Sequence, residues 1–125
     1  MKLMKTLFLV SFINLTMNVN SEIAEVYSYK ANPGETAKML EHMAEAAAIQ
    51  REEGAHVTIN SLDVGSQQQV DYVVRFDSTD DWGAIRDRLQ ANEKWNDFQT
   101  KIGRNPSGTL ELSFAAINID QTTTA

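Results

Sequence analysis

Few residues in this sequence could do chemistry, and its two histidines are the first to consider. The chain contains no cysteine, which excludes disulfides, thiol catalysis and cysteine metal sites. His56, Thr58 and Asn60 alternate along an extended stretch, so their side chains share one face of a strand. A neutral imidazole at His56 could accept a proton or ligate a haem-type group, or form only a hydrogen bond at the strand end. His42 stands among acidic residues in a helical stretch, which favours a solvated helix face over a weak metal site.

Arg75 and two tyrosines complete the candidate set. Arg75 lies in the middle of a strand-like stretch, where a lone charge is costly unless it is paired or faces water. It could pair with Asp71 or Glu111 on the same sheet, which we favour, or it could bind an anionic ligand. Tyr27 and Tyr29 share one face of a strand, where their rings could wall a ligand cavity or pack in an ordinary core. The candidate ligand-binding residues are therefore Tyr27, Tyr29, His56, Asn60 and Arg75, and the candidate catalytic residue is His56.

The sequence lacks the motifs that mark well-known cofactor and metal sites. It contains no phosphate-binding glycine loop, no nucleophile elbow and no zinc signature. Trp82, Trp95 and Phe98 recur at helical spacing and are expected to pack in the core. The acidic residues at 77–81 are typical of a helix start and lack the spacing of a calcium loop. We therefore expect no metal and no cofactor.

The charge balance of the chain limits the classes of partner that it is expected to bind. The 125 residues include 11 Lys and Arg against 17 Asp and Glu, which gives a formal net charge of -6. Such a chain is repelled by nucleic-acid phosphates and by anionic membrane surfaces. We therefore expect neither nucleic acid nor a membrane as partner.

Residues 1–21 have the pattern of a secretory signal peptide. Lys2 and Lys5 precede a mostly apolar stretch, and Ser21 supplies a small residue at the cleavage position. The apolar stretch is shorter than the ~20 residues that span a bilayer. We expect cleavage after Ser21 and a periplasmic or secreted protein, free of the membrane afterwards. The alternative is a buried amino-terminal element of the domain.

The rest of the sequence predicts a strand, a helix, two strands, a helical region and a last strand. The strands are expected at 23–31, 56–64, 70–76 and 110–119, and the first helix at 35–53, ending at Gly54. The helical region follows a cap at 77–80, breaks at 91–92, and ends before a loop at 103–108.

This βαββαβ order is the split βαβ, or ferredoxin-like, arrangement of the α+β class, expected over residues 22–120 with a frayed tail at 121–125. Its four antiparallel strands carry both helices on one face, so the other face must be solvated, liganded or paired. Val73, Leu112 and Ile117 place apolar residues on both faces of the last two strands. We therefore expect a homodimer with two-fold symmetry.

Several segments resemble NIPSNAP-like members of the dimeric α/β-barrel superfamily. They are Tyr-Lys-Ala-Asn-Pro-Gly at 29–34, Asp-Tyr-Val-Val-Arg-Phe-Asp-Ser at 71–78 and Glu-Lys-Trp-Asn-Asp-Phe at 93–98, together with Trp82 and Leu89. The resemblance implies that two ferredoxin-like subunits pair sheet to sheet and enclose a barrel. The superfamily includes cofactor-independent monooxygenases, haem-degrading enzymes and EthD-like proteins. The resemblance thus implies a cavity and a dimer but no single activity.

Three functions are compatible with these observations. The favoured one is an exported dimeric α/β-barrel protein that binds a small apolar or anionic molecule in the barrel. The second is a cofactor-independent enzyme of monooxygenase type that uses His56, Arg75 and the tyrosines. The third is a structural or interaction module without a ligand. The sequence does not decide whether the protein is an enzyme.

Overall fold

A computed structural model describes residues 21–61 and 69–119 of the chain. The expected signal peptide, apart from Ser21, lies outside the described residues, and so does the expected tail at 121–125. Residues 62–68, which include the end of the strand expected at 56–64, also lie outside the described residues. None of the described helices is long and apolar enough to cross a membrane.

The observed elements follow the predicted order. They are β1 (Ile23–Ala31), α2 (Thr36–Glu52), β2 (His56–Ser61), β3 (Gln69–Phe76), α3 (Thr79–Gln90), α4 (Glu93–Arg104) and β4 (Gly108–Ile117). The break predicted at 91–92 separates α3 from α4. The loop between α4 and β4 covers residues 105–107 and is shorter than the predicted loop at 103–108.

Local side-chain caps explain where the two later helices begin. The hydroxyl of Ser78 accepts a hydrogen bond from the Asp81 backbone N–H at 3.0 Å, and the side-chain oxygen of Asn92 accepts one from the Trp95 N–H at 3.1 Å. Each satisfies a backbone donor that the first helical turn leaves without a partner. Gly54 follows α2 with a φ of +106°, a conformation that favours glycine. These residues therefore set the helix ends locally.

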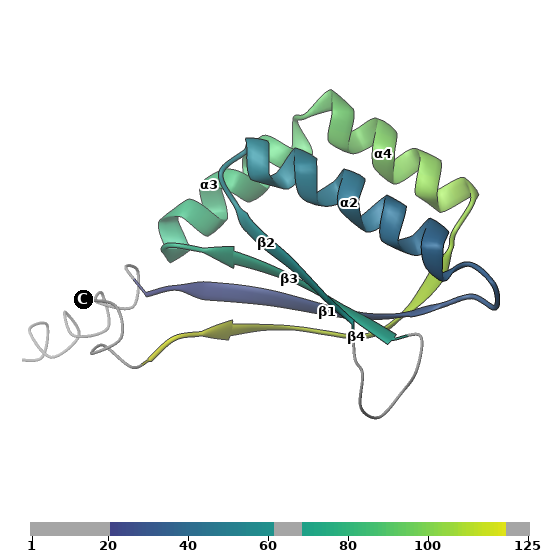
Figure 1. Cartoon of the computed structure of the whole chain (residues 1–125). Helices are drawn as coiled ribbons and strands as arrows, with labels where there is room; N and C mark the ends of the chain where they lie inside the picture. The colour runs from purple at the N-terminus through teal and green to yellow at the C-terminus, as the bar shows by residue number, and fades with distance from the viewer. Residues whose placement is uncertain (1–20, 62–68, 120–125) are drawn as a thin grey trace, which may run out of the picture.

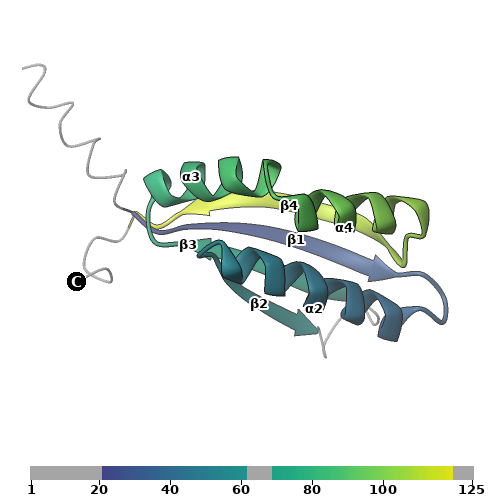
Figure 2. The ribbon, with the colours of Figure 1, turned by 90° about the horizontal axis from the view of Figure 1, so that it is seen from above.

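The four strands form one antiparallel sheet in the order β2-β3-β1-β4. All three helices lie on the same face of the sheet (Figure 1). Seen from above, α3 and α4 run end to end, and α2 lies beside α4 (Figure 2). The fold is ferredoxin-like, as predicted.

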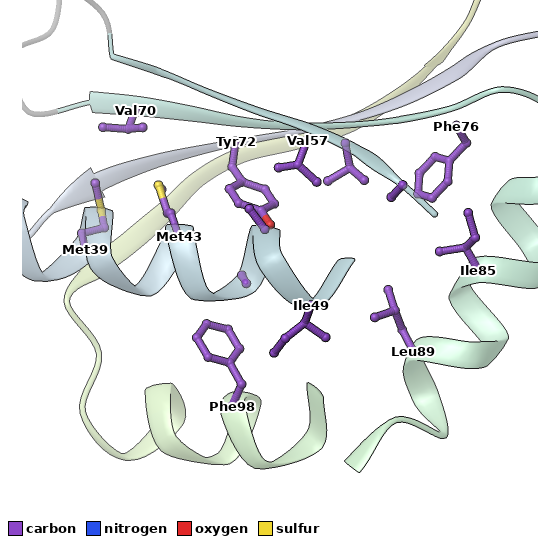
Figure 3. Packing of buried hydrophobic residues seen from close by; sticks show 14 of the residues in the cluster. Met39, Met43, Ile49, Val57, Val70, Tyr72, Phe76, Ile85, Leu89 and Phe98 are labelled. Carbon is purple, nitrogen blue, oxygen red and sulfur yellow. The ribbon is translucent and has the colours of Figure 1, made fainter. Parts of the chain in front are cut away.

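The core lies between the sheet and the helices. Val74 and Phe76 of β3 are 0% and 1% exposed. Figure 3 shows Tyr72 extending from β3 toward α2, and Phe98 extending from α4 toward α2. Trp82 and Trp95, which we expected in the core, are partly buried against it.

The buried face of α2 differs from the predicted one. The sequence pattern suggested a stripe of Ala37, Leu40, Met43 or Ala44, Ala47 and Ala48. The buried residues are instead Met39, Met43, Ala46, Ala47, Ile49 and Gln50. A helix rich in alanine has a weak amphipathic signal, and burying the larger Met39 and Ile49 removes more apolar surface from water.

The sheet face without helices carries a partly exposed apolar stripe. The pairing of β1 with β4 sets Val26 opposite Phe114 and Ser28 opposite Leu112. Leu112 and Phe114 are 57% and 50% exposed. A register shift after Ser28 moves Leu110 to the helix side, opposite Tyr29, although strict alternation predicted one face for all three β4 residues. This stripe is the surface for which the sequence analysis expected a partner.

Candidate functional site

A cavity of about 320 Å³ lies between the sheet and helices α2 and α4. Its floor comes from β1 and β3, its sides from the two helices, and one end from the loop before β4. All three tyrosines of the chain line it. Within the described residues, no Lys, Arg, Asp or Glu contributes to the lining. The residues that matter most for its chemistry are Tyr27, Tyr29, Tyr72, Gln50 and His42.

The hydroxyl of Tyr27 is held by a buried carboxylate. It donates to Oε1 of Glu25 at 2.8 Å. The other carboxylate oxygen accepts from Trp82 Nε1 and from Arg86 Nη1, each at 2.7 Å. Glu25 is 7% exposed, so three donors compensate a charge that burial alone would make costly. Burial and the adjacent Glu25 carboxylate raise the pKa of Tyr27 well above its usual value.

The other two tyrosines differ in their partners. Tyr72 donates its hydroxyl to the side-chain oxygen of Gln50 on α2. Its pKa is raised mainly by burial. The pKa of Tyr29 is also raised, by burial alone, and its hydroxyl has no hydrogen-bond partner among residues 21–61 and 69–119. The cavity therefore holds three protonated phenols at neutral pH.

His42 lies at the end of the cavity near the loop. Its Nδ1 is 3.0 Å from the hydroxyl of Ser107, and its ring meets Phe98 edge-on at 6.5 Å between centroids. The sequence analysis placed His42 on a solvated helix face, whereas the side chain is half-buried and lines the cavity. Its acidic neighbours Glu41 and Glu45 are exposed, and Glu45 pairs with Lys101 of α4 at 2.6 Å.

Gln50 and Tyr72 also line the cavity but were not among the predicted site residues. Gln50 continues the spacing of Met39, Met43 and Ala46 along α2, a repeat of four, three and four residues that marks one helix face. A glutamine at the end of an apolar stripe is a signal for a buried polar contact. Tyr72 was assigned correctly to the buried face of its strand, but its polar partner was not foreseen.

The remaining predicted site residues lie on the opposite face of the sheet. His56 Nε2 is 3.1 Å from Asp77 Oδ1, and the two side chains are 60% and 73% exposed. Arg75 donates to the Thr58 hydroxyl at 3.3 Å and not to either predicted carboxylate. Asn60 is exposed on β2. The structure therefore brings Tyr27 and Tyr29 together but separates them from His56, Asn60 and Arg75.

The described part of the chain offers no obvious metal site. No group of three or more His, Cys, Asp or Glu side chains there is arranged to hold an ion. Asp71, which was considered as a partner for Arg75, accepts the hydroxyl of Ser28 at 2.6 Å. The described lining of the cavity includes no Lys, Arg, Asp or Glu, and the Glu25–Arg86 ion pair contacts this lining through the hydroxyl of Tyr27.

Comparison with solved structures places this fold among bacterial proteins of similar size. A NIPSNAP family protein of unknown function from Agrobacterium tumefaciens is 22% identical, with a TM-score of 0.61 over 79% of this chain and 87% of that chain. An uncharacterized NIPSNAP-like domain protein from Burkholderia xenovorans is 21% identical, with a TM-score of 0.61 over 82% and 88%. A protein of unknown function from Bacteroides thetaiotaomicron, described as a possible oxidoreductase, is 12% identical, with a TM-score of 0.60 over 79% and 99%. No curated protein matches the chain.

The family model for NIPSNAP matches residues 24–106. The match begins in β1 and ends in the loop before β4, so it includes most of the residues that line the cavity. Because it covers more than half of the sequence, this protein belongs to the NIPSNAP family.

Proposed function

We propose that this protein binds one small, neutral and largely apolar molecule in the cavity between the sheet and helices α2 and α4. The observation that carries the proposal is a cavity walled by three tyrosines and apolar side chains, with no Lys, Arg, Asp or Glu in its described lining. Its volume of about 320 Å³ is at the lower end of known ligand pockets. That space equals about ten water molecules, which suits a molecule of one or two rings.

A neutral ligand is favoured over the anionic one that the sequence analysis also allowed. The cation considered for an anion was Arg75, which lies on the opposite face of the sheet. A carboxylate in the cavity would lose its water without a Lys or Arg partner in the described lining, which is costly.

Naphthalene is a suitable probe for this proposal because it is neutral, apolar and small. We expect it to bind the purified protein, as measured by isothermal calorimetry. Ala46 also lines the cavity, whereas Ala44 on the same helix is exposed. Ala46→Leu should weaken binding roughly tenfold or more because close packing leaves no room for both groups, and Ala44→Leu should not.

Two results would contradict the proposal. One is the absence of naphthalene binding to the folded protein, which would favour the structural or interaction module. The other is equal loss of binding in Ala46→Leu and Ala44→Leu. Circular dichroism of both variants shows whether the fold is retained.

Turnover of the ligand by a monooxygenase-type reaction is the alternative function. The description of the Bacteroides protein as a possible oxidoreductase points in that direction. Such a reaction needs a base near the ligand, and the candidate base His56 lies on the other face of the sheet. We therefore favour binding over catalysis through His56.

We also propose that two copies pair through the sheet face that lacks helices. Val26, Leu112 and Phe114 form a continuous apolar stripe there, and the two β4 residues are half exposed in the single subunit. Burying this stripe against a second copy would stabilise a dimer through the hydrophobic effect.

Export remains a proposal based on residues 1–21. Expression of the full chain in a bacterial host should yield a mature protein that begins at Glu22 and is released with the periplasmic fraction. Mass spectrometry of the purified protein measures this, and an intact amino terminus beginning at Met1 would contradict export.

A further inference from the structure

We infer that the ligand carries a hydroxyl group, and that this hydroxyl donates its one proton to the phenol oxygen of Tyr27 or of Tyr72. The inference rests on the proposed function and deepens it by naming the chemical class of the ligand. It follows from the direction of the hydrogen bonds around the cavity.

Tyr27 has no proton free to donate to a ligand. A phenol has one proton to donate and two lone pairs that accept. Tyr27 donates its proton to Glu25 at 2.8 Å, and an ionised carboxylate can only accept. Trp82 and Arg86 donate to the same carboxylate at 2.7 Å each, which fixes its position from the helix side. The Tyr27 hydroxyl therefore has only lone pairs left to offer a ligand in the cavity that Tyr27 lines.

The hydroxyl proton of Tyr72 is also used in a hydrogen bond, but to a different partner. Its hydroxyl donates to the side-chain oxygen of Gln50, and Gln50 is 6% exposed and sits within the packed face of α2. The raised pKa values of both tyrosines agree with phenols that keep their protons. Tyr72 is thus a second acceptor in the cavity wall.

The two acceptors lie next to each other. Tyr27 and Tyr72 are directly paired across β1 and β3, so their Cβ atoms are about 5 Å apart, and both side chains line the cavity. A ligand hydroxyl placed against these two phenols can donate its proton to a phenol oxygen. Neither phenol has a proton left that would point at the ligand hydroxyl. An ether oxygen at the same place would face lone pairs and leave its own lone pairs unsatisfied.

Two groups that can donate a hydrogen bond also line the cavity. Tyr29 has no hydrogen-bond partner in the described residues, and the side-chain nitrogen of Gln50 has none there either. These groups can satisfy a second, accepting atom on the same molecule. The best-matched ligand is therefore a neutral alcohol or phenol, with or without an additional carbonyl or ether oxygen.

Three probes of similar shape test this inference by calorimetry at pH 7. They are 2-naphthol, which has a hydroxyl, 2-methoxynaphthalene, in which the hydroxyl proton is replaced by methyl, and naphthalene, which has no polar group. We expect 2-naphthol to bind about tenfold more tightly than the other two probes. A tenfold difference in affinity corresponds to the net free energy of about one well-formed hydrogen bond. Tyr27→Phe or Tyr72→Phe, whichever removes the acceptor that the ligand uses, should reduce this preference several-fold, measured within each variant as the ratio of its 2-naphthol and naphthalene affinities.

The outcomes separate this inference from the function on which it rests. If naphthalene binds but 2-naphthol binds no better than its methyl ether, the inference is wrong and the proposed function stands. The inference is also wrong if both tyrosine variants keep the full preference for 2-naphthol. If none of the three probes binds, the proposed function fails and the inference fails with it. Naphthalene binding also shows that each variant keeps an intact cavity, and the second tyrosine serves if one variant does not fold.

Discussion

Tyr27 and Tyr72 stand directly opposite each other in the pairing of β1 with β3, yet their hydroxyls donate to different elements. Tyr27 donates to Glu25 on its own strand, and Glu25 is in turn held by Trp82 and Arg86 of α3. Tyr72 donates to Gln50 on α2. The pair therefore connects the sheet to α3 and α2 through hydrogen bonds. Because both hydroxyl protons are used in these bonds, the two phenols can only accept hydrogen bonds from a ligand.

Removing the carboxylate of Glu25 should destabilise the fold. Glu25→Ala leaves the buried hydroxyl of Tyr27 and the indole N–H of Trp82 without their acceptor. An unsatisfied buried polar group costs about 1–3 kcal/mol of unfolding free energy, and we expect a loss of this size in urea denaturation. Glu22→Ala is the matched control because Glu22 is exposed. Equal stability of the two variants would show that the Glu25 contacts contribute little.

The raised pKa values of the three tyrosines predict a loss of stability in alkali. Below about pH 10, the ordinary phenol value, tyrosines are protonated in both folded and unfolded chains. Above it, the unfolded chain releases protons that the folded protein keeps. The free energy of unfolding should therefore fall with rising pH, by up to about 1.4 kcal/mol per pH unit for each tyrosine.

Two measurements check this alkaline prediction. Urea unfolding at several pH values gives the slope, and ultraviolet absorbance follows phenolate formation. Since the chain has three tyrosines and all line the cavity, no exposed tyrosine should contribute a background titration. Appearance of phenolate near pH 10 in the still folded protein would contradict the burial of these side chains.

Substitution of Phe114 should separate the proposed dimer. Phe114→Glu places a charge in the apolar stripe on the helix-free face, where dimer formation would have to desolvate it. We expect sedimentation to show a dimer for the unaltered protein and a folded monomer for this variant. Leu40→Glu is the control, because Leu40 is also partly exposed but lies on α2. A monomeric parent protein, or a Phe114→Glu dimer, would rule out this interface.

Two glycine substitutions should change stability in opposite directions. Gly83 lies within α3 with nothing within 4 Å of an added Cβ, so Gly83→Ala should raise the free energy of unfolding by about 0.5–1 kcal/mol. Gly54 has a φ of +106°, so Gly54→Ala should lower it by about 1–2 kcal/mol. Thermal or urea unfolding of both variants decides this, and a change of the same sign would contradict it.

Local chemistry is the reason that the element order could be predicted from the sequence. The Ser78 and Asn92 caps and Gly54 at the end of α2 mark helix ends within a few residues of chain. Strand alternation marked Val70, Tyr72, Val74 and Phe76 as one face, and these residues are buried. Such signals depend on neighbours in sequence, so a single chain contains them in readable form.

The candidate site depends on contacts between residues far apart in the sequence, and the local sequence pattern does not reveal such contacts. The sequence correctly predicted that Tyr27 and Tyr29 share one face of a strand. It also grouped them with three residues that lie on the other face of the sheet, His56, Asn60 and Arg75. Alternation shows which residues share a face within one strand, but it does not show which faces of different strands lie on the same side of the sheet. The register of β1 with β3 set Tyr27 beside Tyr72, and the packing of α2 on the sheet brought Gln50 and His42 to the same space. Residues far apart in the chain meet there because burial of apolar surface is a property of the whole packed structure. The sequence by itself determined the elements and the family resemblance, and only the tertiary structure decided which polar side chains surround the cavity.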